Sequence, residues 1–427
     1  MATSNSVTGQ TGISWVFEQT HTVGQYINGD WWVLGPVKVI GTNPGYMQSG
    51  SIHLNGSELN PYSARYQGFD SRGHQAGALE YNHALNVGPT IQSGGLTIYG
   101  TAKGESLVST VSQPIVYPNS EPRLQYADVL TVVTTVPEAT EFRPPYCRDQ
   151  SKTYTYYLDS LVADNVREGL ANIGTAPSTS SIIDKIKYVH LNHMHQWNAW
   201  NCMPTMNMPD YGRERNDMLG KLWMLYHTDI LSDGDTNLYN LKVRMAQYAI
   251  DLVGIYENGG KSKWFPDGGI NCAIKPAIIF GAHLLGEDDA IMAIGSAKSF
   301  QEDGQYFYID SNTVLTGKNY TSAMVTNPPT AEWGIRHSFN PALDNALWTI
   351  PGNDYRFISA SMYGTHLGMA IHDDHNNGNW ELGAKKQPFH DYMLRHPVFG
   401  VASSGPAHTI SYDPWLKGLW DAYIGNY

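Results

Sequence analysis

The stretch VLTVVTTVPEATEFRPPYCRDQ, residues 129–150, separates two kinds of sequence. Its first half is a β-branched run typical of a strand, and its second half is a proline-containing connection. Before this stretch, short β-branched or aromatic runs alternate with turn residues. After it, apolar residues recur with a helical period. The chain is therefore predicted to be an α+β protein with two domains, at residues 1–145 and 146–427.

The N-terminal runs predict an antiparallel, β-sandwich-like domain. They are ISWVF at 13–17, WWVLGPVKVI at 31–40, GLTIYG at 95–100, SLVSTVS at 106–112 and VLTVVTTV at 129–136. The triplet Asn28-Gly29-Asp30 precedes the second run, and its residues tolerate the positive φ of a tight hairpin. Trp31 and Trp32 are adjacent, so in a strand they face opposite sides. An outward tryptophan can stack on a sugar ring, although packing is the commoner role.

The C-terminal part is predicted to be an (α/α) toroid or an incomplete α/α barrel. Leu219, Leu222, Trp223 and Tyr226 fall at i, i+3, i+4 and i+7, as on one helix face. The sequence shows no repeat of fixed period, which argues against a regular solenoid. Further helices are predicted at 155–171, 272–285, 288–299, 355–371 and 413–424, and long polar loops at 200–217, 258–271, 300–356 and 373–390.

Composition narrows the classes of function. A net charge of −12 without a basic run argues against nucleic-acid binding. No apolar stretch approaches the roughly 20 residues that span a bilayer, and the N-terminus lacks the features of a signal peptide. With 12% aromatic and 15% charged residues, the profile is typical of extracellular, periplasmic or virion-associated carbohydrate-active proteins. Three cysteines are too few for a disulfide framework or a structural zinc site.

The densest group of chemically active side chains lies between residues 300 and 357, in FQEDGQYFYID, AEWGIRH and PGNDYRF. Such a mixture of acids, cations and aromatic rings is what a carbohydrate-processing cleft needs, although a polar connection between two helices is the plain alternative. The candidate catalytic residues are Glu302, Tyr306, Glu332, Arg336 and His337. The candidate substrate-binding residues of this segment are Asp303, Trp333, Tyr355 and Arg356.

Two mechanisms suit these residues. In β-elimination, Arg336 binds a uronate carboxylate, and His337 acts as base or carboxylate partner. Tyr306 protonates the leaving oxygen and is the alternative base. A tyrosine base needs a neighbouring cation, because its ordinary pKa is about 10. In hydrolysis, the general acid and the general base come from among Glu302, Asp303 and Glu332, on opposite sides of the glycosidic bond. Because Glu302 and Asp303 are adjacent, only one of them is expected to face a substrate.

Other segments supply further candidates for substrate binding. They are Tyr211 and Arg213 in MPDYGRER, Lys275 before Pro276, and His193 and Trp197 in HLNHMHQWNAWNC. No metal or other cofactor is expected. A divalent ion at His193 and His195, or at His372 and Asp374, is the less favoured alternative, because the ligands show no familiar spacing and IHDDHNNGNW has the composition of a solvated loop.

Several motifs together resemble a set of largely uncharacterised bacterial and phage proteins. They are QYINGDWWVLGPVKV, GFDSR, FRPPYC, MPDYGRER, IKPAIIFGAHLL, FQEDGQYFY, EWGIRH and FHDYMLRHP, in this order. The resemblance implies a β domain followed by an (α/α) toroid. At the level of fold, the pattern is also similar to polysaccharide lyases with an (α/α) toroid, such as alginate, heparin and glucuronan lyases.

The sequence thus favours a lyase that cleaves a uronate-containing polysaccharide by β-elimination. A glycoside hydrolase on the same scaffold is the first alternative, and a non-catalytic carbohydrate-binding or virion protein is the second. The expected partner is a polysaccharide, with no role for nucleic acid or membrane.

Overall fold

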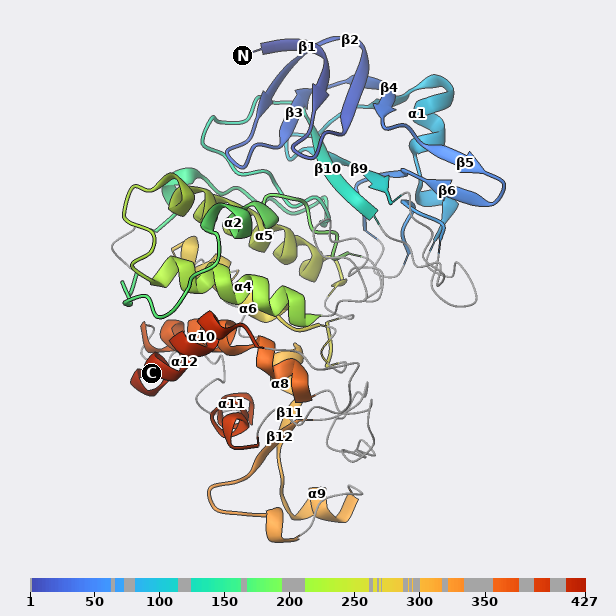
Figure 1. The fold of residues 1–427 in the computed structure, drawn as a ribbon. Helices are drawn as coiled ribbons and strands as arrows, with labels where there is room; N and C mark the ends of the chain where they lie inside the picture. The colour runs from blue at the N-terminus through green and yellow to red at the C-terminus, as the bar shows by residue number, and fades with distance from the viewer. Residues whose placement is uncertain are drawn as a thin grey trace.

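The protein is a mixed α and β structure in which a curled sheet lies at one end and the helices lie beneath it (Figure 1). This confirms the predicted α+β class. The computed structural model describes residues 2–62, 66–72, 81–113, 124–162, 167–193, 212–260, 264–266, 269, 271–286, 291, 294, 300–316, 322–333, 356–375, 388–399 and 412–427.

The N-terminal half contains one large sheet in the strand order β7-β9-β10-β3-β2-β4-β8, with β1 paired to β2. All neighbours are antiparallel except β10 and β3, which are parallel. The strands are β1 (Ala2–Thr8), β2 (Ser14–Gln25), β3 (Trp31–Leu34), β4 (Val37–Asn43), β7 (Ser57–Leu59), β8 (Leu96–Ile98), β9 (Glu105–Ser112) and β10 (Leu124–Val133). A separate hairpin joins β5 (Met47–Ser49) to β6 (Ile52–Leu54), and α1 (Gly88–Gly94) packs on β4.

A single curled sheet replaces the two stacked sheets of a sandwich among the described strands. The N-terminal part of β2 pairs with β4 and its C-terminal part pairs with β3, so the sheet turns along this strand. A register shift between Val16 and Phe17 marks a bulge, which bends a strand locally. The predicted hairpin between β2 and β3 is confirmed, with Gly29 at φ 91°.

Strands β9 and β10 are buried on both faces. Leu107 and Leu130 belong to the core inside the curled sheet, whereas their neighbours Val108 and Val129 belong to the core shared with the helices. Successive side chains of a strand point to opposite faces, so the apolar run of β10 serves both cores. Trp32 packs with Tyr26 and Val133 on one face, and Trp31 packs against the inner core, as the alternation predicts.

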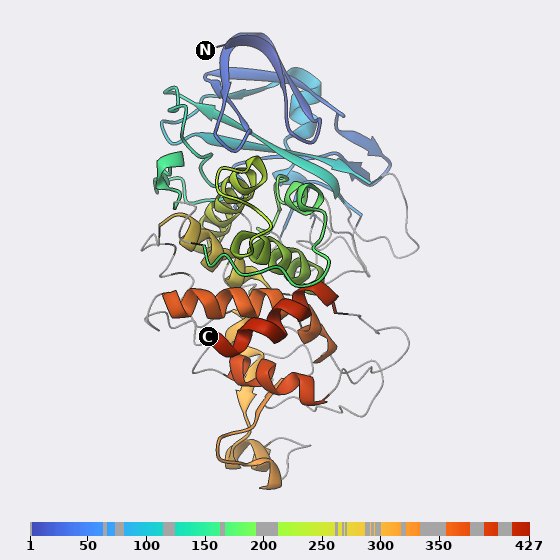
Figure 2. The ribbon, with the colours of Figure 1, turned by 60° about the vertical axis from the view of Figure 1, so that its left-hand side comes forward.

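The helices stack in layers below the sheet (Figure 2). Next to the sheet lie α2 (Thr179–Lys185) and α5 (Thr236–Glu257), followed by α4 (Gly212–His227) and α6 (Ile274–Leu284), and then α10 (Tyr363–His375) and α12 (Pro414–Tyr423). Farther away are α8 (Gln301–Gly304), α11 (Pro388–Phe399), α9 (Ser311–Thr316) and the ribbon of β11 (Tyr306–Tyr308) and β12 (Ala331–Trp333). A closed ring of helices is not evident in the described part of the chain.

The helix predictions are confirmed for 272–285 and 413–424, which correspond to α6 and α12. The prediction for 355–371 corresponds to a 3-10 helix, Arg356–Ser361, followed by α10. The helix predicted at 155–171 is wrong: a 3-10 turn at Leu158–Ser160 is followed by extended backbone at Leu161, and residue 170 forms a bridge with residue 228. Most of 288–299 lies outside the described residues. No described helix is long and apolar enough to cross a membrane.

A buried ion cluster ties the sheet to the helices. Arg143, with 1% of its side chain exposed, donates to Asp30 in the β2–β3 turn and to Asp251 on α5, each at 2.6 Å. Asp251 also accepts the backbone N–H of Tyr146 at 3.1 Å. A buried arginine needs such partners, because an unpaired charge in the interior is costly. The proline-containing connection between the two halves is thereby held against both.

Candidate active site

Glu302 is the candidate residue with the most distinctive environment. It lies on the short helix α8 with 4% of its surface exposed. One carboxyl oxygen, Oε1, accepts the backbone N–H of Ala273 at 2.6 Å. The other oxygen, Oε2, is buried and has no hydrogen-bond partner within the described residues. A buried carboxyl group with one open oxygen has an unmet need for a donor or acceptor.

The backbone of Ala273 directs its N–H at Glu302. Ala273 has a φ of 69°, in the left-handed region, immediately before the first residue of α6. A residue other than glycine, asparagine or aspartate seldom adopts this conformation, which costs of order 1 kcal/mol or more. Strained backbone of this kind is concentrated at functional sites.

Burial sets the protonation state of Glu302. It raises the pKa of the carboxyl group from 4.5 to about 7, against the opposing effect of the hydrogen bond from Ala273. Glu302 is thus partly protonated near neutral pH. A carboxylic acid that holds its proton at this pH is suited to act as a general acid.

Arg215 and Tyr306 share the surroundings of Glu302. Arg215, on α4, is fully buried, and burial lowers its pKa while the charges of Tyr248, Cys272 and Glu302 raise it. Arg215 Nη2 donates to Asn192 Oδ1 at 3.0 Å. The site therefore brings together residues from α4, α8, β11 and the start of α6.

A polar network continues from Arg215 to the sheet. Asn192 donates its backbone N–H to the hydroxyl of Tyr146 at 2.9 Å, and that hydroxyl donates to the carbonyl of His190 at 3.2 Å. His193 Nδ1 lies 3.3 Å from the same hydroxyl, and His193 Nε2 lies 3.7 Å from Glu58 Oε2 on β7. His193 is thus buried within this network.

Asp303 and Lys275 form a buried ion pair beside Glu302. Their side chains are 5% and 1% exposed, respectively. Asp303 Oδ2 also accepts the backbone N–H of Phe300 at 3.1 Å, which fixes the first turn of α8. Of the two adjacent acids, Asp303 is held by Lys275 and Glu302 keeps an oxygen open.

Tyr306 lies on β11 with 3% exposure, and its hydroxyl donates to Met362 Sδ at 2.9 Å. Burial raises its pKa well above the ordinary value, and Cys272, Tyr392 and Glu302 raise it further. The charges that act most on Tyr306 in the described part of the chain therefore disfavour its ionised form. A basic tyrosine needs the opposite environment.

Glu332 lies on the neighbouring strand β12. It pairs across the ribbon with Phe307 and is 1% exposed. Arg395 Nη2, on α11, donates to Glu332 Oε2 at 2.7 Å, an ion pair that requires the ionised carboxylate. Glu332 thus lies on one strand of the ribbon, and Glu302 lies on the short helix that precedes the other strand.

The remaining candidates are dispersed or undescribed. Arg213, in the first turn of α4, pairs with Glu214. Arg356 begins the 3-10 helix before α10, and only its backbone is described. Several predicted residues lie outside the described part of the chain, namely Trp197, Tyr211, Arg336, His337 and Tyr355. For Trp333, only the backbone pairing with Tyr306 is described.

The described residues contain no group of three acids, histidines or cysteines that could hold a metal. His372 and Asp374 lie on α10 rather than in the expected solvated loop. They are two positions apart on a helix, so they point in different directions: His372 is buried and Asp374 is exposed. His195 lies outside the described residues, so the less favoured alternative of an ion at His193 and His195 is untested.

Four contributors to this site were not among the candidates predicted from sequence: Ala273, Asn192, Arg215 and Tyr248. Asn192 Nδ2 donates to Tyr248 Oη at 3.5 Å. An alanine in the left-handed region carries no sequence signal, and Tyr248 falls in an apolar helical pattern that predicts core packing. Arg215 belongs to the motif MPDYGRER, from which only Tyr211 and Arg213 were chosen as candidates.

Comparison with known proteins adds no relative. No protein family, no characterised protein and no solved structure matches the chain.

Proposed function

We propose that this protein is a carbohydrate-active enzyme that hydrolyses glycosidic bonds, with Glu302 as the proton donor. The observation that carries the proposal is the buried carboxyl group of Glu302, which has one open oxygen and a pKa raised to about 7. Its proton would pass to the glycosidic oxygen as the bond to the departing sugar breaks. The aromatic-rich and charge-poor composition supports a saccharide substrate.

Glu332 is our candidate for the second carboxylate. Hydrolysis needs an ionised acid that either activates water or attacks the sugar, and the ion pair with Arg395 would stabilise that form of Glu332. With Glu302 as the acid, Glu332 would serve as the base or the nucleophile.

β-Elimination from a uronate polymer is the second candidate reaction. Tyr248 suits the role of its base better than Tyr306 does. Arg215 acts to lower the pKa of Tyr248, although burial raises it overall, and Asn192 lies within hydrogen-bonding distance of its hydroxyl. Removal of a proton next to a carboxylate needs a base, which the tyrosine can supply, and groups such as a cation and an amide that bind the carboxylate. In this route Glu302 would donate the proton to the leaving oxygen.

We extend the proposal to the architecture and location. The layered helices would belong to an incomplete α/α barrel, whose end nearest Glu302 receives a polysaccharide. The protein would work outside the cell, in the periplasm or on a virion.

A product assay tests the proposal. Purified protein is incubated with neutral and uronate-containing polysaccharides, and both new reducing ends and ultraviolet absorbance are followed. New reducing ends without absorbance are expected. Absorbance that rises with the reducing ends would replace hydrolysis by β-elimination, because elimination leaves an unsaturated sugar. The absence of both signals on every polymer tested would contradict an enzymatic role.

A further inference from the structure

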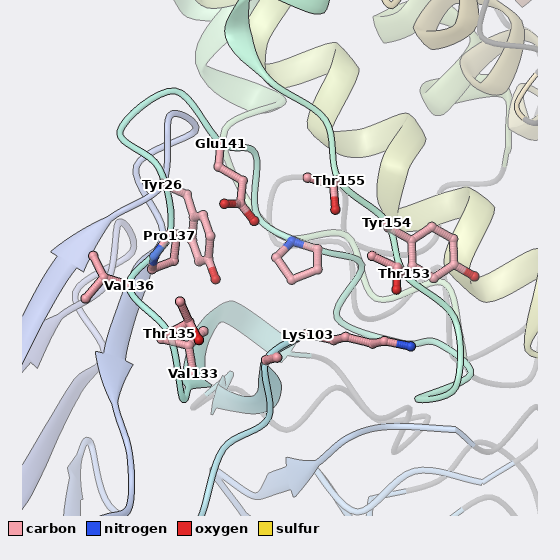
Figure 3. A pocket seen from close by; sticks show the side chains of 12 residues that line it. Tyr26, Lys103, Val133, Thr135, Val136, Pro137, Glu141, Thr153, Tyr154 and Thr155 are labelled. Carbon is pink, nitrogen blue, oxygen red and sulfur yellow. The ribbon is translucent and has the colours of Figure 1, made fainter.

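A pocket of about 110 Å³ opens at the junction of the sheet and the helical half (Figure 3). Four chain segments form it: the end of β2, the turn before β9, the connection that follows β10, and residues 153–155. None of its lining residues belongs to the Glu302 site. The residues are Tyr26, Ala102, Lys103, Val133, Thr135, Val136, Pro137, Glu141, Pro144, Thr153, Tyr154 and Thr155. Junctions of this kind are a common location for small-molecule sites.

Three threonine hydroxyl groups and the carboxylate of Glu141 are available for a ligand in this pocket. Thr135, Thr153 and Thr155 are exposed, and no hydrogen bond to their hydroxyl groups is made within the described residues. Figure 3 shows the side chain of Glu141 between Tyr26 on one side and Thr155 on the other. Glu141 Oε2 accepts only the backbone N–H of Glu138, at 3.2 Å, among the described groups, which leaves Oε1 open.

The cation and the second tyrosine of the pocket are committed elsewhere. Lys103 Nζ donates to the carbonyl of Ser151, and the hydroxyl of Tyr154 donates to Glu257. Because their polar ends are bound elsewhere, Lys103 and Tyr154 present apolar atoms to the pocket. Val136 and Pro137 add further apolar surface. The pocket therefore combines three threonine hydroxyl groups and one carboxylate with apolar patches, and Lys103, the cation among its described lining residues, is already bound.

This combination selects the class of ligand. A sugar ring has hydroxyl groups at its edge and apolar C–H faces, which match the two kinds of lining. An anion such as a uronate or a phosphate would approach the carboxylate of Glu141 unfavourably. A single carboxylate is a poor cage for a metal ion. The volume equals that of roughly four water molecules at about 30 Å³ each, which suits part of one ring.

We propose that this pocket binds one neutral pyranose, with Glu141 and the three threonine hydroxyls as hydrogen-bonding partners. The site is independent of the proposed hydrolysis. It gives the protein a second place to hold a saccharide, at the junction between its two halves.

Saturation-transfer difference NMR tests the inference. The probes are the methyl β-glycosides of glucose, galactose and xylose, with methyl β-glucuronide as the charged comparison. At least one neutral glycoside is expected to bind, and the glucuronide to bind more weakly. Thr155→Val and Glu141→Gln should each weaken binding by about three- to tenfold, because each removes or weakens one hydrogen bond.

Two controls locate the binding. Thr97→Val changes an exposed threonine on β8, outside the pocket, and should leave binding unchanged. Glu302→Gln should also bind as the wild type does, which separates this site from the proposed active site. The inference is overturned if no neutral glycoside binds, if the folded Thr155→Val and Glu141→Gln variants bind like the wild type, or if only Glu302→Gln loses binding.

Discussion

At the scale of single residues, the chemistry of an acidic side chain in this protein depends on the surroundings in which it is buried. Glu302 and Asp303 are neighbours in sequence, yet a lysine holds one and the interior surrounds the other. Adjacency alone predicts that they differ in orientation. The partner of each acid comes from chain about 30 residues away, so sequence could not assign it.

The pKa of Glu302 leads to a prediction about stability. Because the folded-state pKa, about 7, is higher than the ordinary value of 4.5, the folded protein binds more protons between these pH values than the unfolded chain does. This contribution to stability is complete below pH 4.5 and is lost as pH rises through 7. We expect it to amount to about 3 kcal/mol, and Glu302→Gln to abolish it.

Urea unfolding at several pH values measures this effect. Asp128 also has a pKa raised by burial to about 7, so the wild type should lose stability with pH through both acids. The Glu302→Gln variant should show the shallower slope. Equal slopes for the two proteins would mean that Glu302 ionises normally in the folded state.

At the scale of elements, close packing of α5 and α6 fixes the helical core. A Cβ atom added at Gly281 would lie 1.9 Å from the Cβ of Ala249, and both positions are inside helices whose backbones cannot easily shift. We expect Gly281→Ala to destabilise the protein by about 1–3 kcal/mol or more, despite the higher helix propensity of alanine.

Gly418 on α12 provides the matched control. Among the described residues, a Cβ atom there meets only Ile173 Cγ2, at an ordinary 3.6 Å. Gly418→Ala should therefore be neutral or stabilising by up to about 1 kcal/mol. Thermal unfolding of the two variants checks the contrast, and similar melting temperatures would contradict the packing described for α5 and α6.

A helix or strand can be predicted from sequence when the features that determine it lie within its own residues. Strands β3 and β4 and helices α6 and α12 have their own alternation, helical period or capping residue, such as Asp413 at the start of α12. Residues 155–162 have apolar spacing that predicts a helix. Their backbone instead follows tertiary contacts, since Val162 N–H donates to the carbonyl of Leu284. The curl of the sheet arises from long-range pairing, which no local pattern shows.

At the scale of the whole molecule, the two halves are joined by charge as well as by apolar contact. Arg143 contacts an aspartate from each half, and Glu58 and His193 meet across the same boundary. A sequence boundary near residue 145 is a useful prediction, but strands β9 and β10 contribute to both cores. We therefore expect the halves to unfold together.

Asp251→Ala tests this coupling. It leaves the buried Arg143 with one of its two aspartates, and loss of a partner from a buried ion pair costs about 3–5 kcal/mol. The expected result is a single unfolding transition at a lower denaturant concentration. Asp184→Ala, which removes an exposed partner of Arg244, is the control and should change stability by less than about 1 kcal/mol. Two separate transitions in the wild type would contradict joint unfolding.

The role of Glu302 as proton donor is tested most directly by the dependence of rate on the leaving group. Hydrolysis by wild type and by Glu302→Gln is compared on aryl glycosides of the sugar that the enzyme cleaves, with phenols of increasing acidity, and Glu138→Gln serves as the surface control. A loss of about 100-fold or more is predicted for the least acidic phenols, which need a donated proton, and little loss for the most acidic ones. An equal loss on all substrates, or no loss on any, would contradict the assignment of Glu302.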